Sequence, residues 1–146
     1  MSSKMSLTTV NTVLAAIVAL FALYLGLSFI LAPVASTQGV GLPTWPTANG
    51  DGFLVMKGTR ELAMALVLGV LLVTGHRRAL GWVLLMVAVT PFGDMINVLA
   101  HHGPAAAAFG IHGLTSVVIA TAGMLVLRET STARTSPDLA SVAQPS

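Results

Sequence analysis

The sequence predicts an all-α protein, a bundle of four transmembrane helices, and two observations support this fold class. The chain has 146 residues, 55% hydrophobic and only 8% charged, whereas a soluble domain carries about 25% charged residues. The hydrophobic residues are collected into four long stretches, at residues 13–32, 53–73, 80–99 and 105–127. Each stretch is long enough to cross a hydrocarbon core of about 30 Å as a helix, the form in which the backbone satisfies its own hydrogen bonds.

Four helices are expected, at about residues 10–33, 53–74, 79–100 and 105–128. They form one transmembrane domain over residues 1–128, and residues 129–146 have the composition of a disordered tail. A cleaved signal peptide is the alternative for the first stretch. Its apolar run is longer than the usual core of about 7–15 residues, and no clear A-x-A cleavage site follows it. We therefore expect the first helix to be retained.

Positive charge is unevenly distributed between the two sides of this bundle. The connections at residues 33–52 and 101–104 contain no lysine or arginine. By the positive-inside rule these connections face outward, and both termini are cytoplasmic, in a multi-pass protein of the cell membrane. Five positive residues lie on the expected cytoplasmic side: Lys4, Arg77, Arg78, Arg128 and Arg134.

The ionisable residues inside the hydrophobic stretches are expected at the outer end of the bundle. Lys57, Arg60 and Glu61 fall in the first turns of the second helix, and Asp94 falls in the last turns of the third. His112 lies near the start of the fourth helix, where the helix dipole favours a neutral imidazole. Residues three and four apart share one helical face, and a charge at mid-bilayer costs about 3 kcal/mol or more. We therefore expect these faces to converge on the bundle interior.

Three further polar residues are candidates for the same site. Asn97 and His101 follow Asp94 on one face of the third helix, and Tyr24 interrupts the first hydrophobic stretch. Because such groups are unfavourable in lipid, we expect all three to turn toward the site and help bind a guest molecule.

The four charges are expected to pair with one another. Arg60 is the preferred partner of Asp94, because a guanidinium and a carboxylate can meet through two hydrogen bonds. Glu61 is then left to Lys57, four residues earlier, or to a substrate. Pro91 should bend the third helix, since it cannot donate to the carbonyl four residues before it.

Two classes of function remain open for this cluster. In the first, the protein is an enzyme acting on a lipophilic small molecule: Asp94, Glu61 and His112 exchange protons, while Lys57 and Arg60 hold an anion or a developing oxyanion. Isomerisation, cyclisation and cofactor-free oxygenation would all suit these groups. In the second, the cluster is a structural ion-pair network in a non-catalytic binding or accessory protein. Transport is a weaker third reading, because four helices make a narrow pathway unless the chain forms a homo-oligomer.

Other partners and cofactors are not expected. His101, His112 and Asp94 have the chemistry of a metal site, but the sequence has neither H-x₃-H nor H-E-x-x-H spacing. The absence of cysteine excludes thiolate ligands and disulfides. No basic run is interleaved with aromatic residues, so nucleic acid is not expected either. The expected partners are the lipid bilayer and a lipophilic small molecule.

Four segments, "KGTRELAMAL", "GHRRALGW", "PFGDMINVL" and "GIHGLTS", resemble the DUF4267 family of small integral membrane proteins, a domain of unknown function. The resemblance runs over roughly residues 20–127 and implies a four-helix membrane bundle without indicating a reaction. The chain is also similar in size and layout to DoxX-like proteins and to small membrane anthrone oxygenases. The family pattern falls on Lys57, Gly58, Arg60, Glu61, Pro91, Gly93, Asp94, His112 and Gly113, where Glu61 replaces an aspartate.

Overall fold

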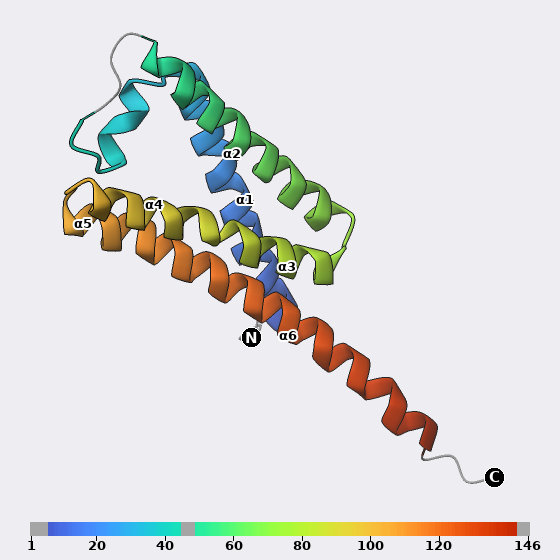
Figure 1. Cartoon of the computed structure of the whole chain (residues 1–146). Helices are drawn as coiled ribbons and strands as arrows, with labels where there is room; N and C mark the ends of the chain where they lie inside the picture. Colours follow the sequence, from blue (N-terminus) through green and yellow to red (C-terminus); the bar gives the residue numbers. More distant parts are fainter. Residues whose placement is uncertain (1–5, 45–48, 143–146) are drawn as a thin grey trace, which may run out of the picture.

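The computed structural model describes residues 6–44 and 49–142, with side chains as far as Ser131, and this part of the chain contains helices and no strands (Figure 1). The all-α class is therefore confirmed. The elements are, in order, α1 (Leu7–Leu31), the 3₁₀ helix η1 (Ala35–Gly39), α2 (Gly50–Val73), α3 (Arg77–Val87), α4 (Val89–Ala100), α5 (Ala105–Ala107), the π-helical turn η2 (Ala108–Gly113) and α6 (Leu114–Val142).

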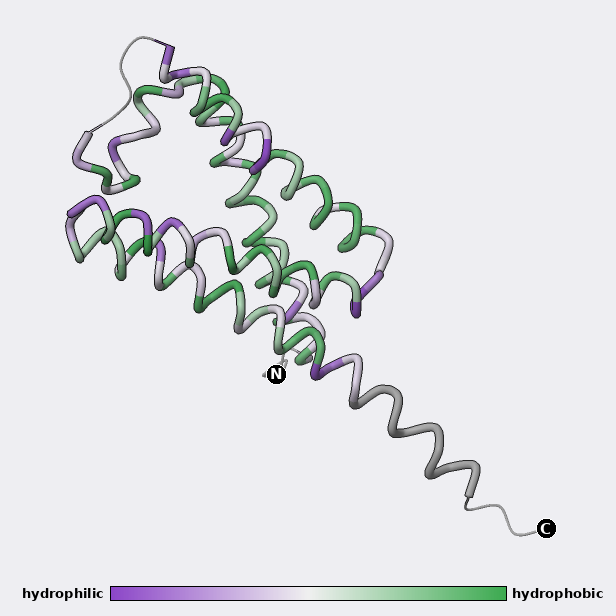
Figure 2. Tube along the Cα trace, in the orientation of Figure 1, coloured by the Kyte–Doolittle hydropathy of each residue, from purple (hydrophilic) through white to green (hydrophobic). Residues whose placement is uncertain are grey.

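Three helical segments are long and apolar enough to cross a membrane: Leu7–Leu31, Arg77–Ala100 and Ala105–Ser131. Helix α2 matches them in length but carries Lys57, Arg60 and Glu61 within its apolar sequence. Figure 2 shows hydrophobic residues along most of each long helix, with hydrophilic residues at the connections and inside α2. The chain is a multi-pass membrane protein on this evidence, while the side on which its termini lie stays a prediction.

The expected third helix is present as two helices with a break at Ala88. Helix α3 ends at Val87 and α4 begins at Val89. Pro91 has no N–H to donate to the carbonyl of Val87, so the helix is interrupted where the sequence predicted a bend. The Ser116 hydroxyl of α6 donates a hydrogen bond to the Ala88 carbonyl over 2.9 Å, which attaches α6 to the break.

Helix α6 extends beyond the end predicted for the fourth helix. Its backbone is helical to Val142, whereas the sequence placed the end at about residue 128. Most of the predicted tail, residues 132–146, lies outside the part of the chain whose side chains are described. A disordered tail at residues 129–146 therefore stays a prediction.

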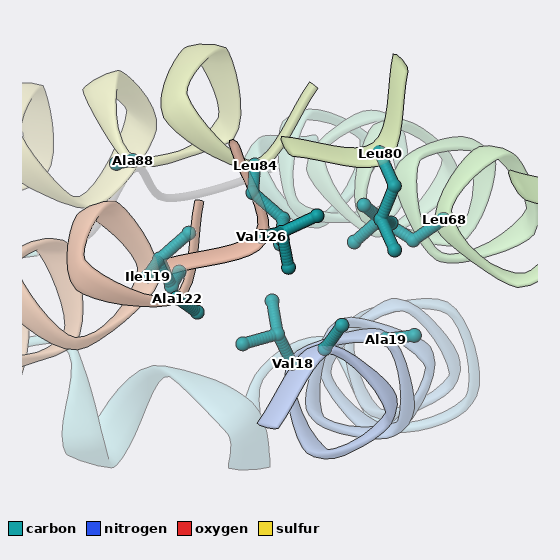
Figure 3. Close-up of a cluster of buried hydrophobic side chains, with 10 residues drawn as sticks. Val18, Ala19, Leu68, Leu80, Leu84, Ala88, Ile119, Ala122 and Val126 are labelled. Atoms are coloured by element: carbon teal, nitrogen blue, oxygen red, sulfur yellow. The ribbon is translucent and has the colours of Figure 1, made fainter. Parts of the chain in front are cut away.

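The hydrophobic core fills one half of the bundle, beside the α2–α3 connection. Side chains from four helices point toward one another there: Val18 and Ala19 of α1, Leu68 of α2, Leu80 and Leu84 of α3, and Ile119, Ala122 and Val126 of α6 (Figure 3). Leu68, Leu80, Leu84 and Val126 are fully buried. The half of the bundle nearer η1 lacks such a cluster among the described residues, and it is there that the helices enclose a cavity.

Two pairs of glycines allow the helices to approach closely. A Cβ atom on Gly26 of α1 would lie 2.7 Å from the Leu62 nitrogen of α2, and one on Gly58 would lie 2.8 Å from the Gly26 carbonyl oxygen. Gly81 of α3 and Gly123 of α6 form a second crossing of the same kind. Small residues at helix crossings are the usual means of packing helices in lipid. The Gly26–Gly58 crossing also places Lys57 next to α1.

A second polar network ties the helices together at the end opposite η1. Arg77 of α3 lies 2.8 Å from a carboxylate oxygen of Glu129 in α6, and the side-chain amide of Asn11 in α1 donates to the same oxygen over 2.9 Å. Arg77 also donates to the Thr12 hydroxyl over 2.9 Å. Glu129 is the first residue of the predicted tail, so this network was not predicted from the sequence.

We predict that Gly58→Ala destabilises the bundle by about 1–3 kcal/mol, because the added methyl group meets the backbone of α1 and forces α1 and α2 apart. Gly69→Ala in the same helix is the matched control, since a Cβ there meets nothing within 4 Å and alanine raises helix propensity. Denaturant titration of the purified protein in mixed micelles measures both. Equal stability of the two variants would contradict the close crossing.

Candidate functional site

A cavity of about 400 Å³ lies between α1, η1, α2, α4 and the start of α6. This volume falls within the range of about 300–1,000 Å³ that is usual for small-molecule sites. Most of its wall is hydrocarbon, contributed by Phe21, Ala22, Leu25, Phe29, Met64 and Ile119 among others. A guest that fills it must therefore be largely apolar.

Lys57 joins the two carboxylates of this cavity. Its Nζ lies 3.3 Å from Oδ2 of Asp94 on α4 and 3.4 Å from Oε1 of Glu61 one turn along α2. All three residues line the cavity. The side chains are partly buried, with exposed fractions of 31% for Lys57, 34% for Asp94 and 13% for Glu61. The contact between Lys57 and Asp94 is thus a charge pair that connects two helices at the wall of an apolar space.

The ring of Phe29 completes the surroundings of Lys57. Nζ lies 5.6 Å from the ring centroid, within the distance at which a cation is attracted to an aromatic face. Phe29 is buried on α1, one turn beyond Gly26. The Gly26–Gly58 crossing, the aromatic ring and the two carboxylates therefore hold the ammonium group from three helices.

The predicted pair of Arg60 with Asp94 is wrong. Arg60 is exposed on the outer surface of α2, does not line the cavity and forms no ion pair with any described residue. Lys57 takes its place because it is the cation on the face of α2 that turns toward α4. Arg60, three residues further, lies at the exposed edge of this broad face and does not reach the cavity.

His112 is held in a defined orientation at the cavity wall. It is 9% exposed, and its Nε2 lies 2.8 Å from the carbonyl oxygen of Val40. Because a carbonyl only accepts hydrogen bonds, Nε2 carries the proton, and in the neutral ring Nδ1 carries the lone pair. No described residue forms a hydrogen bond with this Nδ1.

Two irregular segments bring His112 and Val40 together. The π-helical turn η2 ends at Gly113, and such turns often occur at functional sites. On the other side, Gly41 has a φ of +83° and packs so closely on Ala107 that a Cβ would lie 2.6 Å from the Ala107 methyl. The connection after η1 therefore packs on Ala107, at the start of the fourth span. This contact places the Val40 carbonyl within hydrogen-bond distance of the His112 imidazole.

The remaining predicted site residues divide into two groups. Tyr24 lines the cavity from α1 but is largely exposed, and its ring stacks on Phe21 at 6.4 Å between centroids. Asn97 on α4 and His101, which follows the end of α4, are both exposed and do not line the cavity; the imidazole Nδ1 of His101 lies 2.9 Å from the Asn97 carbonyl oxygen. The structure thus brings together Lys57, Glu61, Asp94, His112 and Tyr24 and leaves out Arg60, Asn97 and His101.

Several cavity residues were missed from the sequence. Val40, Ser36 and Gly39 come from the connection after the first span, which the sequence reading treated only as a loop. Phe29 and Thr90 also line the cavity. The one available signal for the loop was its density of glycine and proline, which indicates a structured connection but not which carbonyl it presents.

The described residues contain no group of three or more His, Asp or Glu side chains placed to hold a metal ion. The polar groups of the cavity are instead one cation, two carboxylates, one imidazole and hydroxyls. Their common chemistry is the donation and acceptance of protons and hydrogen bonds.

Fold and site together define a small helical membrane protein with an apolar cavity, which has a charged triad and a histidine in its wall. A family model described as a domain of unknown function, DUF4267, matches residues 19–126. The chain therefore belongs to the DUF4267 family, as the sequence motifs indicated. No curated protein and no solved structure matches it. The likeness in layout to DoxX-like proteins stays a prediction.

We predict that Lys57→Met destabilises the bundle by about 1–3 kcal/mol, because it leaves two carboxylates unpaired beside hydrocarbon; the partial exposure keeps this below the cost for a fully buried pair. Arg60→Met is the matched control and should change stability by no more than about 0.5 kcal/mol, since Arg60 is exposed and unpaired among the described residues.

Adding Asp94→Asn to Lys57→Met should recover part of the loss, which is the signature of a coupled pair. Denaturant titration in mixed micelles measures all four proteins. A larger loss for Arg60→Met than for Lys57→Met would contradict the observed pairing.

Proposed function

We propose that this protein is a membrane-embedded enzyme that transfers protons on a lipophilic small molecule bound in the cavity. One observation supports the proposal most strongly: a largely apolar cavity of about 400 Å³ has two carboxylates and a buried histidine in its wall. Ionisable residues inside membrane segments are expensive, and they are functional candidates by default.

His112 is the proposed proton acceptor. Its Nε2–H is engaged by the Val40 carbonyl, which leaves the lone pair on Nδ1 for a substrate proton. A hydrogen-bonded orienting group behind an imidazole is the arrangement that general bases commonly use. The role of the connection after η1 would then be to fix the tautomer of His112.

Asp94 and Glu61 are the proposed groups that return or share the proton. One oxygen of each carboxylate pairs with the Lys57 ammonium group, and the other oxygen forms no ion pair with the described residues. Lys57 places a positive charge within 3.4 Å of an oxygen of each carboxylate, which offsets the repulsion between the two groups. The simplest reaction for His112, Asp94 and Glu61 is isomerisation, in which a proton is removed from one carbon and returned to another. Cyclisation and cofactor-free oxygenation could use the same proton acceptor.

The expected use of Lys57 and Arg60 as an anion clamp is not part of this proposal. Lys57 is already between two carboxylates, and Arg60 lies outside the cavity. We further propose that the site opens to the outer leaflet of the cell membrane, because the lysine and arginine distribution puts the α1–α2 and α4–α5 connections on that side.

A second function is favoured by one specific contact. Lys57 satisfies both carboxylates at once, as a structural network would require. In that case the protein binds a lipophile or a partner without catalysis. Variants such as Asp94→Asn remove a charge and keep the shape of the site. Only the catalytic function predicts that such variants lose turnover.

The proposed catalysis predicts that Asp94→Asn and His112→Ala each reduce turnover at least 100-fold, in the range usual for loss of a general acid or base. Protein in nanodiscs is incubated in D₂O with a lipophile extract of its source cells, and deuterium incorporation is followed by mass spectrometry. Thermal unfolding checks that both variants fold. Asp51→Asn, on the exposed first turn of α2, is the matched control and should incorporate deuterium at the wild-type rate. Wild-type rates in both site variants would refute catalysis.

A further inference from the structure

We infer that the guest of this cavity carries an ammonium head, so that the protein binds a lipophilic amine with its charge against Asp94 and Glu61. The inference rests on the proposed function, because it names the substrate class of the same site. It follows from the charge of the cavity, from its unused hydrogen-bonding groups and from its aromatic wall.

The charge of the cavity is negative. Its wall contains one cation, Lys57, and two carboxylates, Glu61 and Asp94. The guanidinium of Arg60, which would have balanced them, lies outside the lining. The triad of Lys57, Glu61 and Asp94 therefore carries one unbalanced formal negative charge, and in surroundings of hydrocarbon a cationic guest is the natural counter-ion.

Some hydrogen-bond donors of the wall are in use, whereas the hydroxyls of Tyr24, Ser28 and Thr90 form no hydrogen bond with the described residues. The Ser36 hydroxyl donates to the Ala32 carbonyl over 2.9 Å, and the Thr115 hydroxyl donates to the Ile111 carbonyl over 2.6 Å. The Nε2–H of His112 is directed at the Val40 carbonyl.

Lys57 directs its ammonium group at two carboxylate oxygens. What remains for a guest includes three acceptors, the second oxygens of Asp94 and Glu61 and the lone pair of His112, beside the hydroxyls of Tyr24, Ser28 and Thr90. A guest that only accepts, such as a carboxylate or a ketone, could pair with these hydroxyls but offers no donor to the two carboxylates. An ammonium group supplies up to three donors to the same acceptors.

The aromatic residues of the wall add to this preference. Phe21, Tyr24 and Phe29 all line the cavity from α1. An aromatic face attracts a cation, and the Phe29 ring already does so with Lys57 at 5.6 Å. The apolar remainder of the wall then accommodates the hydrocarbon part of the amine.

The experiment compares three probes with the same ten-carbon chain: decylamine, decanol and decanoate. Binding of each radiolabelled probe to the full chain in nanodiscs is measured by equilibrium dialysis at pH 7, with empty nanodiscs as the reference for partition into lipid. We expect decylamine to bind at least tenfold more tightly than decanol, and decanoate to show no binding above the reference.

Two neutral variants and one control test whether the cavity carboxylates are responsible. Asp94→Asn and Glu61→Gln should each weaken decylamine binding about tenfold while leaving decanol binding unchanged. Either variant serves alone if the other does not fold. Asp51→Asn removes the same charge from the exposed first turn of α2, outside the cavity, and should bind decylamine as the wild type does.

Two outcomes would overturn the inference. If decanol or decanoate binds at least as tightly as decylamine, and cavity variants alter that binding, the ammonium head is refuted while the proposed lipophile site stands. If no probe binds above empty nanodiscs, both the inference and the proposed lipophile site are refuted.

Discussion

The contact of Lys57 with Glu61 and Asp94 is the constraint on which the rest of the site depends. It joins α2 to α4 at 3.3 Å across the cavity wall, and it allows two carboxylates to coexist in an apolar space. The contact needs α2 to lie close to α1, which the Gly26–Gly58 crossing permits. It also depends on the placement of α4, which carries Asp94 and begins at Val89, after the break at Ala88. A few features of the backbone thus position a cluster that would be unfavourable in lipid.

The bundle is divided into a packed half and a hollow half. At the α2–α3 end, branched side chains from four helices fill the interior, and the Arg77–Glu129–Asn11 network ties three helices together. At the other end the helices separate around the cavity, and the connection after η1 helps to form its wall. The packed half can hold the polar groups of the site in place, while the hollow half leaves room for a guest.

Much of the fold could be predicted from the sequence, and less of the site. Hydrophobic stretches and their lengths predicted the helical bundle, and Pro91 predicted a bend near the point where the third helix is interrupted, because both depend on local chemistry. The partner of Asp94 was wrongly predicted, because spacing puts Lys57 and Arg60 on one broad face and does not say which of them turns toward α4. The bond from His112 to Val40 could not be predicted, since it depends on how an irregular connection seats on a π-helical turn.

Solid-state NMR in lipid tests the central contact most directly. The chain has two lysines, so Lys4→Arg leaves Lys57 as the single lysine amine that can be labelled with ¹⁵N. With ¹³C-labelled aspartate and glutamate side-chain carboxyls, the dipolar coupling from Nζ reports its distance to each kind of carboxylate. We predict strong dephasing from both labels, and loss of the aspartate effect in Asp94→Asn. Dephasing from glutamate alone would contradict the bridge between α2 and α4.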